Sequence, residues 1–255
     1  MTDKFWGKYR GKVTGTHDPL NLGRIQVEVA NVFGDGRSNW AMPCTPYAGK
    51  DIGLFMVPPV GSNIWVEFED GDTAYPIWSG CFWGEQELPA KAQIQHPEEV
   101  QLFRAQGVTL VVSREATSKG LTLNVEQPVV DKSLRLVYNP DGIELNHDNQ
   151  MSVCLLTSSQ EVVVKNGSTT TVKLTADTIE LQEAGISVKI TNNSIELVCG
   201  PSKVQLSTNS GIDMSSTPAV VKVGASGVDI NSGGMGTIAI ALGGVNVNRG
   251  ALEVT

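Results

Sequence analysis

The C-terminal half of the chain repeats one short pattern, in which a charged residue lies between two apolar ones. Four copies lie within residues 168–198: VKL at 172, IEL at 179, VKI at 188 and IEL at 195. Alternate side chains of a β-strand point to opposite faces, so each copy directs two apolar side chains to one face and a charge to the other. Residues typical of turns, mainly Thr, Ser, Asn and Gly, separate the copies. The pattern therefore predicts short β-strands with one apolar face.

These predicted strands recur at a regular interval. The first apolar residues of successive copies, from Val163 to Val245, are 7 to 10 residues apart, and a pair of strands recurs every 16 or 17 residues. Such short strands bury too little apolar area to offset their loss of chain entropy, so several must stack. A single-chain β-helix commonly has about 18 to 25 residues per turn and aromatic residues inside. Three interwound chains, each supplying one strand per layer in rotation, fit this aromatic-free region better.

The predicted core of this trimeric shaft consists of the paired apolar residues, which point to the shared axis. They are Val172, Leu174, Ile179, Leu181, Val188, Ile190, Ile195, Leu197, Val204, Leu206, Ile212, Met214, Val221, Val223, Val228 and Ile230. The charged residues between them, from Lys173 to Asp229, are expected to form ladders of alternating sign in solvent. Ile195→Asp should therefore prevent trimerisation, whereas Glu196→Lys should have little effect.

The N-terminal part of the chain has a different pattern and a different core. Short alternating segments bounded by Gly or Pro predict five or six strands before residue 85, with no helical periodicity. Thirteen of the fifteen aromatic residues lie before residue 84, and we expect Trp78 and Trp83 to fill the interior. This pattern is typical of a small closed barrel such as the OB-fold.

The predicted fold class is therefore all-β, with an N-terminal OB-fold barrel followed by a trimeric interwound β-helix, or β-prism. We assign residues 1–84 to the OB-fold domain and residues 85–106, which contain two prolines, to a linker. Residues 107–160 are expected to form an irregular start of the shaft, and residues 161–255 the repetitive triple-stranded spike.

Charge and cysteine usage narrow the function. A net charge of −8 argues against nucleic acid as the main ligand. The four cysteines show no metal-binding spacing, so we expect buried, reduced thiols and no metal. The first residues lack the apolar segment of a signal peptide, and no later run is long enough to span a bilayer. Synthesis in a bacterial cytoplasm is the expectation.

Two groups of residues are candidates for catalysis. The carboxylates of Glu67, Glu69, Asp70 and Asp72 could be read as a pair for glycoside cleavage, but strand alternation and a turn explain them fully. His147 and Asp148 lack a nucleophile placed by the pattern. We therefore predict no catalytic, cofactor-binding or metal-binding residue and no enzymatic activity.

Four segments of the N-terminal part carry a family resemblance: LGRIQVEV, WAMPCTPYAG, PPVGSNIWVEFEDGD and YPIWSGCFWG. In this order they resemble the OB-fold domain of phage baseplate assembly protein V and of VgrG-like central spikes of contractile injection systems. The resemblance covers about residues 7 to 84. It implies a homotrimer on the tail axis, within an assembled phage tail or phage-tail-like particle.

The resemblance also implies partners. Because no hub domain precedes the barrel pattern, the head is expected to bind a separate baseplate hub protein. A PAAR-type tip protein is expected to cap the C-terminal strand edges, and the target membrane is met only transiently on puncture. The expected tip-cap interface is Asn248, Gly250, Leu252, Val254 and Thr255.

The predicted function is structural: a needle that transmits the force of sheath contraction and punctures the target envelope. The alternative is a trimeric adhesin-like stalk whose OB head binds a polysaccharide or protein ligand, and an exposed aromatic groove on the barrel would favour it. A polysaccharide-processing β-helix enzyme is the third interpretation, and it predicts clustered rather than evenly spread charges.

Overall fold

The computed structural model describes residues 3–234, 236–248 and 252–254. The chain divides into two compact units, Met1–Ala90 and Lys91–Thr255. We refer to the first as the head and to the strands of the second as the repeat sheet. None of the helices among the described residues has the length and hydropathy needed to cross a bilayer.

Five strands of the head form a closed barrel in the order β1-β2-β3-β7-β6. Neighbouring strands are antiparallel except β3 and β7, which are parallel. The barrel strands are β1 (Tyr9–Gly15), β2 (Ile25–Glu28), β3 (Ser38–Pro43), β6 (Asn63–Phe68) and β7 (Pro76–Cys81). The connections contain the helix α1 (Ala30–Phe33), a small hairpin of β4 (Ala48–Gly49) and β5 (Ile52–Gly53), and a 3-10 turn at Glu69–Gly71.

The core of the head follows the predicted alternation. On β6, Ile64 and Val66 are fully buried and Phe68 is nearly so, whereas the residues between them are partly exposed. Phe68 packs against the rings of nearby aromatic residues at centroid distances of 5.4 to 6.2 Å. Trp78 is buried in this core as expected, but Trp83 is exposed because it lies beyond the end of β7. The prediction for Trp83 was wrong.

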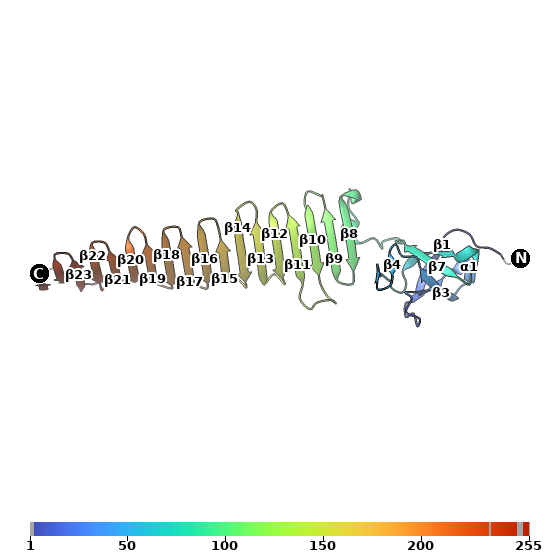
Figure 1. Cartoon of the computed structure of the whole chain (residues 1–255), viewed down its shortest axis with the longest axis horizontal. Helices are drawn as coiled ribbons and strands as arrows, with labels where there is room; N and C mark the ends of the chain where they lie inside the picture. The colour runs from blue at the N-terminus through green and yellow to red at the C-terminus, as the bar shows by residue number, and fades with distance from the viewer. Residues whose placement is uncertain (1–2, 235, 249–251, 255) are drawn as a thin grey trace. The chain divides into compact units, whose positions relative to one another are not determined.

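The second unit is one continuous antiparallel meander, in which each strand from β8 to β24 pairs with the next strand of the sequence. Figure 1 shows these strands side by side in sequence order. They are β8 (Val100–Ala105), β9 (Val108–Ser113), β10 (Gly120–Val125), β11 (Leu134–Asn139), β12 (Gly142–His147), β13 (Met151–Leu156), β14 (Glu161–Asn166), β15 (Thr170–Leu174), β16 (Thr178–Glu183), β17 (Ile186–Thr191), β18 (Ser194–Cys199), β19 (Ser202–Ser207), β20 (Gly211–Ser216), β21 (Ala219–Gly224), β22 (Gly227–Asn231), β23 (Thr237–Ala241), β24 (Gly244–Val247) and β25 (Leu252–Val254).

The structure confirms an all-β chain with an N-terminal barrel followed by a long antiparallel sheet of the kind that a β-prism requires. It differs from the sequence prediction in how the strands are paired. The hydrogen-bonded neighbours of each strand belong to the same chain, whereas we expected strands of three chains to alternate within a layer. One chain therefore builds a whole sheet.

The repeat sheet also begins earlier and is more regular than predicted. A 3-10 turn at Pro97–Glu99 leads directly into β8, within the segment assigned to a linker. From β9 to β14 the strands pair in the same continuous register as the later ones. At the other end the strands shorten, from six residues in β21 to five in β22 and four in β24, so the sheet narrows (Figure 1).

At some of the turns between strands a glycine lies so close to the neighbouring strand that a side chain would not fit. Gly142 is an example. Its φ is +140°, and an added Cβ would overlap the carbonyl oxygen of Leu155 on β13. At Gly185, with φ +100°, an added Cβ has open space.

Gly142→Ala is therefore expected to lower the free energy of unfolding of the repeat sheet by about 2 to 4 kcal/mol, since backbone strain and overlap add. Gly185→Ala carries only the cost of its positive φ, about 1 kcal/mol. Denaturant unfolding of the two variants measures the difference. Equal losses would show that the close approach to Leu155 does not limit the turn.

Candidate functional site

The main candidate site is the apolar face of the repeat sheet. The register places the predicted core residues in two parallel columns, which we call the apolar columns. One column contains Val172, Leu181, Val188, Leu197, Val204, Met214, Val221 and Ile230, and the other contains Leu174, Ile179, Ile190, Ile195, Leu206, Ile212, Val223 and Val228. All sixteen predicted residues therefore lie on one face, each opposite another member of its column.

The apolar columns extend beyond the predicted set in both directions. Toward the C-terminus they continue through Ile238 and Ile240 to β24. Toward the N-terminus one column continues through Val164 and Leu145 as far as Phe103 on β8, and the other ends at Val112 on β9, which lies opposite Gln101. This stretch was missed because several outward-facing positions there, among them Val111, Val137 and Val163, are also apolar, which weakens the alternation.

This face is open to solvent in the single chain. Ile195 is 41% exposed, Leu197 42% and Ile179 44%. A soluble monomer seldom exposes a contiguous apolar patch larger than a few hundred Å². A face of this length, with one cross-strand apolar pair after another, therefore has the character of a protein interface.

The opposite face carries a central column that changes character along the chain. From β8 to β14 it includes Val111, Val137 and Val163, each less than a tenth exposed. From Lys173 to Asp229 it consists almost entirely of charged residues of alternating sign. We call this second part the charged ladder.

The charged ladder has the cross-strand geometry that the sequence predicted. Lys189 lies directly opposite both Glu180 and Glu196 in the register. The Nζ of Lys203 lies 2.5 Å from Oε2 of Glu196. Opposite charges on neighbouring strands stabilise a sheet modestly, and here they alternate rather than cluster.

A further pair joins the ladder at its N-terminal end. The Nζ of Lys173 lies 2.6 Å from Oε1 of Glu161. The hydrogen bond from Lys173 lowers the pKa of the Glu161 carboxyl from its ordinary value. This carboxylate therefore stays ionised in the folded chain at any pH near neutrality.

Glu196 provides a test of how much the ladder contributes. Glu196→Gln should change the free energy of unfolding by less than about 1 kcal/mol, because exposed ion pairs contribute little. Glu196→Lys adds an ammonium beside Lys189 and Lys203, so its stability should rise with added salt while that of Glu196→Gln should not. Urea unfolding at two salt concentrations measures both. A large loss in Glu196→Gln would mean that this face is covered.

The predicted tip-cap residues lie partly outside the described residues, as Gly250 and Thr255 do. Leu252 and Val254 belong to β25, which pairs with β24. Asn248 has φ +52°, and its side-chain oxygen accepts a hydrogen bond from the backbone N–H of Thr237 at 3.1 Å. The structure therefore gives Asn248 a local role in ordering the end of the sheet.

Glu67, one of the candidate carboxylates for catalysis, forms an ion pair. The Glu67 carboxylate lies 2.8 Å from Nζ of Lys8, whose hydrogen bond lowers its pKa. The described residues contain no group of three His, Cys, Asp or Glu side chains placed to hold a metal ion. All four cysteines are free thiols, but three of them are exposed, so the expectation of burial was wrong.

The family comparison concerns the head. Its barrel has the strand order and buried alternation described above, and Gly61, in the PPVG segment between the hairpin and β6, has φ +90°. Residues 9–83 match the family model of the type VI secretion system/phage-baseplate injector OB domain. The head matches the injector OB domain. The match begins at the first residue of β1 and ends just after β7, so it includes the whole barrel.

The family match gives the injector OB domain a structural role in a baseplate or spike. It confirms the resemblance seen in the sequence to baseplate assembly protein V and VgrG-like spikes. No curated protein matches the chain. The repeat sheet lies outside the matched residues, so what it does follows from its own geometry.

Proposed function

We propose that the chain is the central spike of a contractile phage-tail-like injection system and acts as a homotrimer. The observation that carries the proposal is the joining of a head that matches the injector OB domain to a sheet whose two apolar columns run unbroken from β9 to β24. Such a sheet needs partners of matching length and pattern. A copy of the same chain satisfies both requirements.

In the proposed trimer the three sheets enclose a shared apolar interior. Each sheet forms one side of a triangular prism and directs its two apolar columns inward, while the charged ladder faces water. The resemblance to VgrG-like spikes supports three chains rather than two. The alternating charges limit repulsion between copies that each carry a net charge of −8.

The mechanism is mechanical. The strands run across the long direction of the repeat sheet, so their hydrogen bonds lie along it (Figure 1). A load applied along this direction passes from strand to strand through many hydrogen bonds and through the packed apolar columns at once. The shortening of β22 to β24 places the narrowest part of the sheet at the C-terminal end, where a piercing tool concentrates force. No enzymatic step belongs to this role.

We also propose two protein partners for the spike and the kind of particle to which it belongs. A separate hub protein binds the head, and a PAAR-type tip protein binds the end formed by β24 and β25. The spike then belongs to an assembled phage tail or phage-tail-like particle and contacts the target membrane only during puncture.

Electron cryomicroscopy of a particle assembled with this chain tests the proposal. We expect three-fold density at the end of the tube, in which each face of a tapering prism fits one repeat sheet. Density for this chain away from the tube axis, or with another symmetry, would contradict it.

A second candidate is the stalk with a ligand-binding head. One observation favours it, namely an open groove on the head bordered by the exposed aromatic residues Tyr47 and Phe55. The spike and the stalk share the trimer but differ in what occupies this groove.

A further inference from the structure

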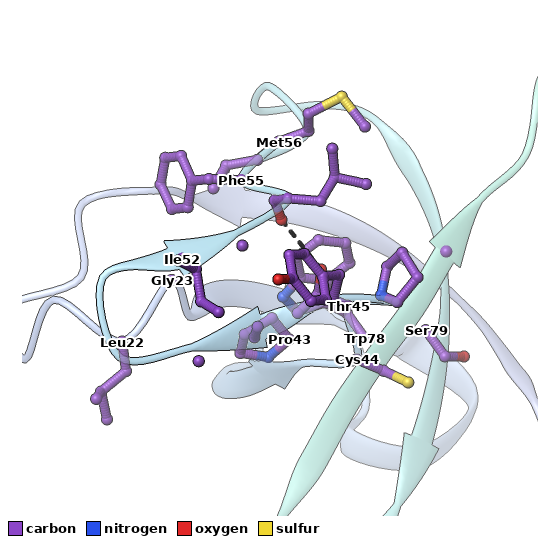
Figure 2. Close-up of a pocket in the computed structure, with 18 of the residues that line it drawn as sticks. Leu22, Gly23, Pro43, Cys44, Thr45, Ile52, Phe55, Met56, Trp78 and Ser79 are labelled. Atoms are coloured by element: carbon purple, nitrogen blue, oxygen red, sulfur yellow. Dashed lines mark hydrogen bonds between the residues drawn. The ribbon is translucent and has the colours of Figure 1, made fainter.

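The repeat sheet carries a pocket of about 410 Å³ whose lining differs from that of the groove on the head. The head groove is mainly apolar, with Phe55 and Met56 among the side chains that line it (Figure 2). The pocket on the sheet, which we call the sheet pocket, is lined mostly by hydroxyl, amide and charged side chains of residues 116–119, 122, 135, 137 and 139–141. Its lining is therefore suited to a polar ligand.

The sheet pocket lies on the face opposite the apolar columns. Thr122 on β10 and Val137 on β11 lie directly opposite each other on this face and form the floor. The β9–β10 connection, residues 114–119, and the turn between β11 and β12 border the pocket at one edge of the sheet. All lining residues belong to one chain, so the pocket does not depend on the association of chains.

Hydrogen bonds fix both connections that border the pocket. The hydroxyl of Ser113, a residue only 3% exposed, lies 2.8 Å from the hydroxyl of Ser118 and accepts the backbone N–H of Glu115 at 3.1 Å. In the turn between β11 and β12, the side-chain oxygen of Asn139 accepts the backbone N–H of Asp141 at 3.0 Å. The sheet pocket is therefore a preformed part of the fold.

The charged residues of the lining are Lys119, Arg135 and Asp141, which together carry one net positive charge. Within residues 3–234, 236–248 and 252–254, neither Lys119 nor Arg135 belongs to an ion pair. Two cations without a carboxylate partner in one preformed pocket are suited to an anionic group.

The carboxylates closest in the register and along the chain already have partners. Glu144, which lies opposite Val137, accepts a hydrogen bond from the side-chain amide of Asn146 at 3.1 Å. Glu115 accepts one from the hydroxyl of Ser118 at 3.0 Å. These contacts leave the cations of the sheet pocket available to a ligand.

Size and charge together narrow the class of ligand. Pockets for small molecules begin at about 300 Å³, so the sheet pocket is large enough for a sugar ring and larger than a bare ion requires. One net positive charge matches one carboxylate, whereas a phosphate monoester, with a charge of about −1.5 to −2 near neutrality, would lie uncompensated beside Asp141. Val137, only 6% exposed, offers an apolar floor for the C–H face of a ring, and Thr122 and Asn139 offer hydrogen bonds to ring hydroxyls.

We propose that the sheet pocket binds an acidic sugar unit of the uronic acid type. The guanidinium of Arg135 and the ammonium of Lys119 hold the carboxylate, since charge-assisted bonds to a carboxylate are the strongest that such a ligand can form. The carboxylate of Asp141 accepts hydrogen bonds from the sugar hydroxyls. This activity goes beyond the proposed spike and does not rest on it.

Titration of the intact chain with D-glucuronate, followed by isothermal titration calorimetry, tests the inference. We expect saturable binding at one site per chain, at least about tenfold tighter than binding of D-glucose or of inorganic phosphate, because a hydrogen bond to a charged group contributes more than a neutral one. Arg135→Ala should weaken glucuronate binding at least about tenfold.

Arg104→Ala is the matched control, because Arg104 lies in the same column of the same face as Arg135 but outside the pocket. This variant should bind glucuronate as the unmodified chain does. Lys119→Ala, in a different segment from Arg135, should also weaken binding, so the result does not depend on one variant folding correctly.

Three results would overturn the inference. The first is the absence of saturable glucuronate binding, and the second is an affinity for D-glucose or inorganic phosphate equal to that for glucuronate. The third is equal weakening by Arg104→Ala and Arg135→Ala. The mass of the chain in solution is a separate measurement, so failure of this inference is distinguishable from failure of the proposed spike.

Discussion

Ile195→Asp is expected to abolish the assembly of three chains at micromolar concentration. Ile195 lies between Ile190 and Leu206 in one apolar column, where the register allows no polar neighbour in the column. A trimer of the variant places three carboxylates in an apolar interior, and each costs several kcal/mol to desolvate without a partner. Light scattering after size-exclusion chromatography should show that the three-chain species is lost.

Two matched variants separate this effect from a general loss of folding. Ile195→Val keeps an apolar side chain in the column and should keep the trimer, at a cost of about 0.5 to 1.5 kcal/mol per chain. Glu196→Gln changes the adjacent residue on the opposite face and should also keep it. A trimeric Ile195→Asp chain would show that this face does not form the interface.

Asp18→Ala is expected to lower the apparent melting temperature of the head by at least about 5 °C. The Asp18 side chain is only 5% exposed, and its Oδ1 accepts hydrogen bonds from the Arg24 guanidinium at 2.7 and 3.1 Å. The same carboxylate accepts the backbone N–H groups of Leu20 and Leu22. Removing it leaves a half-buried guanidinium and several N–H groups of the β1–β2 connection without acceptors.

The same carboxylate gives the head a pH dependence with a defined sign. Hydrogen bonds from Arg24 and from backbone N–H groups hold the pKa of Asp18 well below its usual range. A lowered pKa stabilises the folded state fully above the pKa of the unfolded chain, near 4, and this contribution is lost as the pH falls below that value. Asp18→Asn, which keeps the shape but not the charge, should melt at an intermediate temperature and show a flatter profile between pH 5 and 3. Unchanged melting of both variants would contradict the role assigned to Asp18.

The apolar columns were predictable from the sequence because a period of two fixes the face of every residue in a strand. Val172 and Leu174 had to share a face, and the turn residues between copies set the strand lengths. The pattern does not determine which chain supplies the neighbouring strand. Pairing within one chain and pairing between three chains bury the same residues, and the short turns that join successive strands in the structure decide in favour of one chain.

Other features depended on information that a pattern does not contain. Val111, Val137 and Val163 lie on the face opposite the apolar columns, so β9, β11 and β14 carry apolar residues on both faces and looked irregular in the sequence. In the head, Phe55 is a large apolar residue of the kind expected in the core, but it is exposed at the edge of the groove. Its segment follows the β4–β5 hairpin and does not belong to a barrel strand. The role of Asp18 depends on hydrogen-bond geometry within a turn, where a single aspartate is unremarkable.

One copy of this chain leaves its apolar columns exposed, and we propose that three copies cover them. The most direct measurement is the mass of the intact, unmodified chain in solution, by light scattering or native mass spectrometry. We expect a single species of three chains, each of 27.2 kDa, that persists on dilution to the nanomolar range. A stable, cooperatively folded species of one chain would contradict the account.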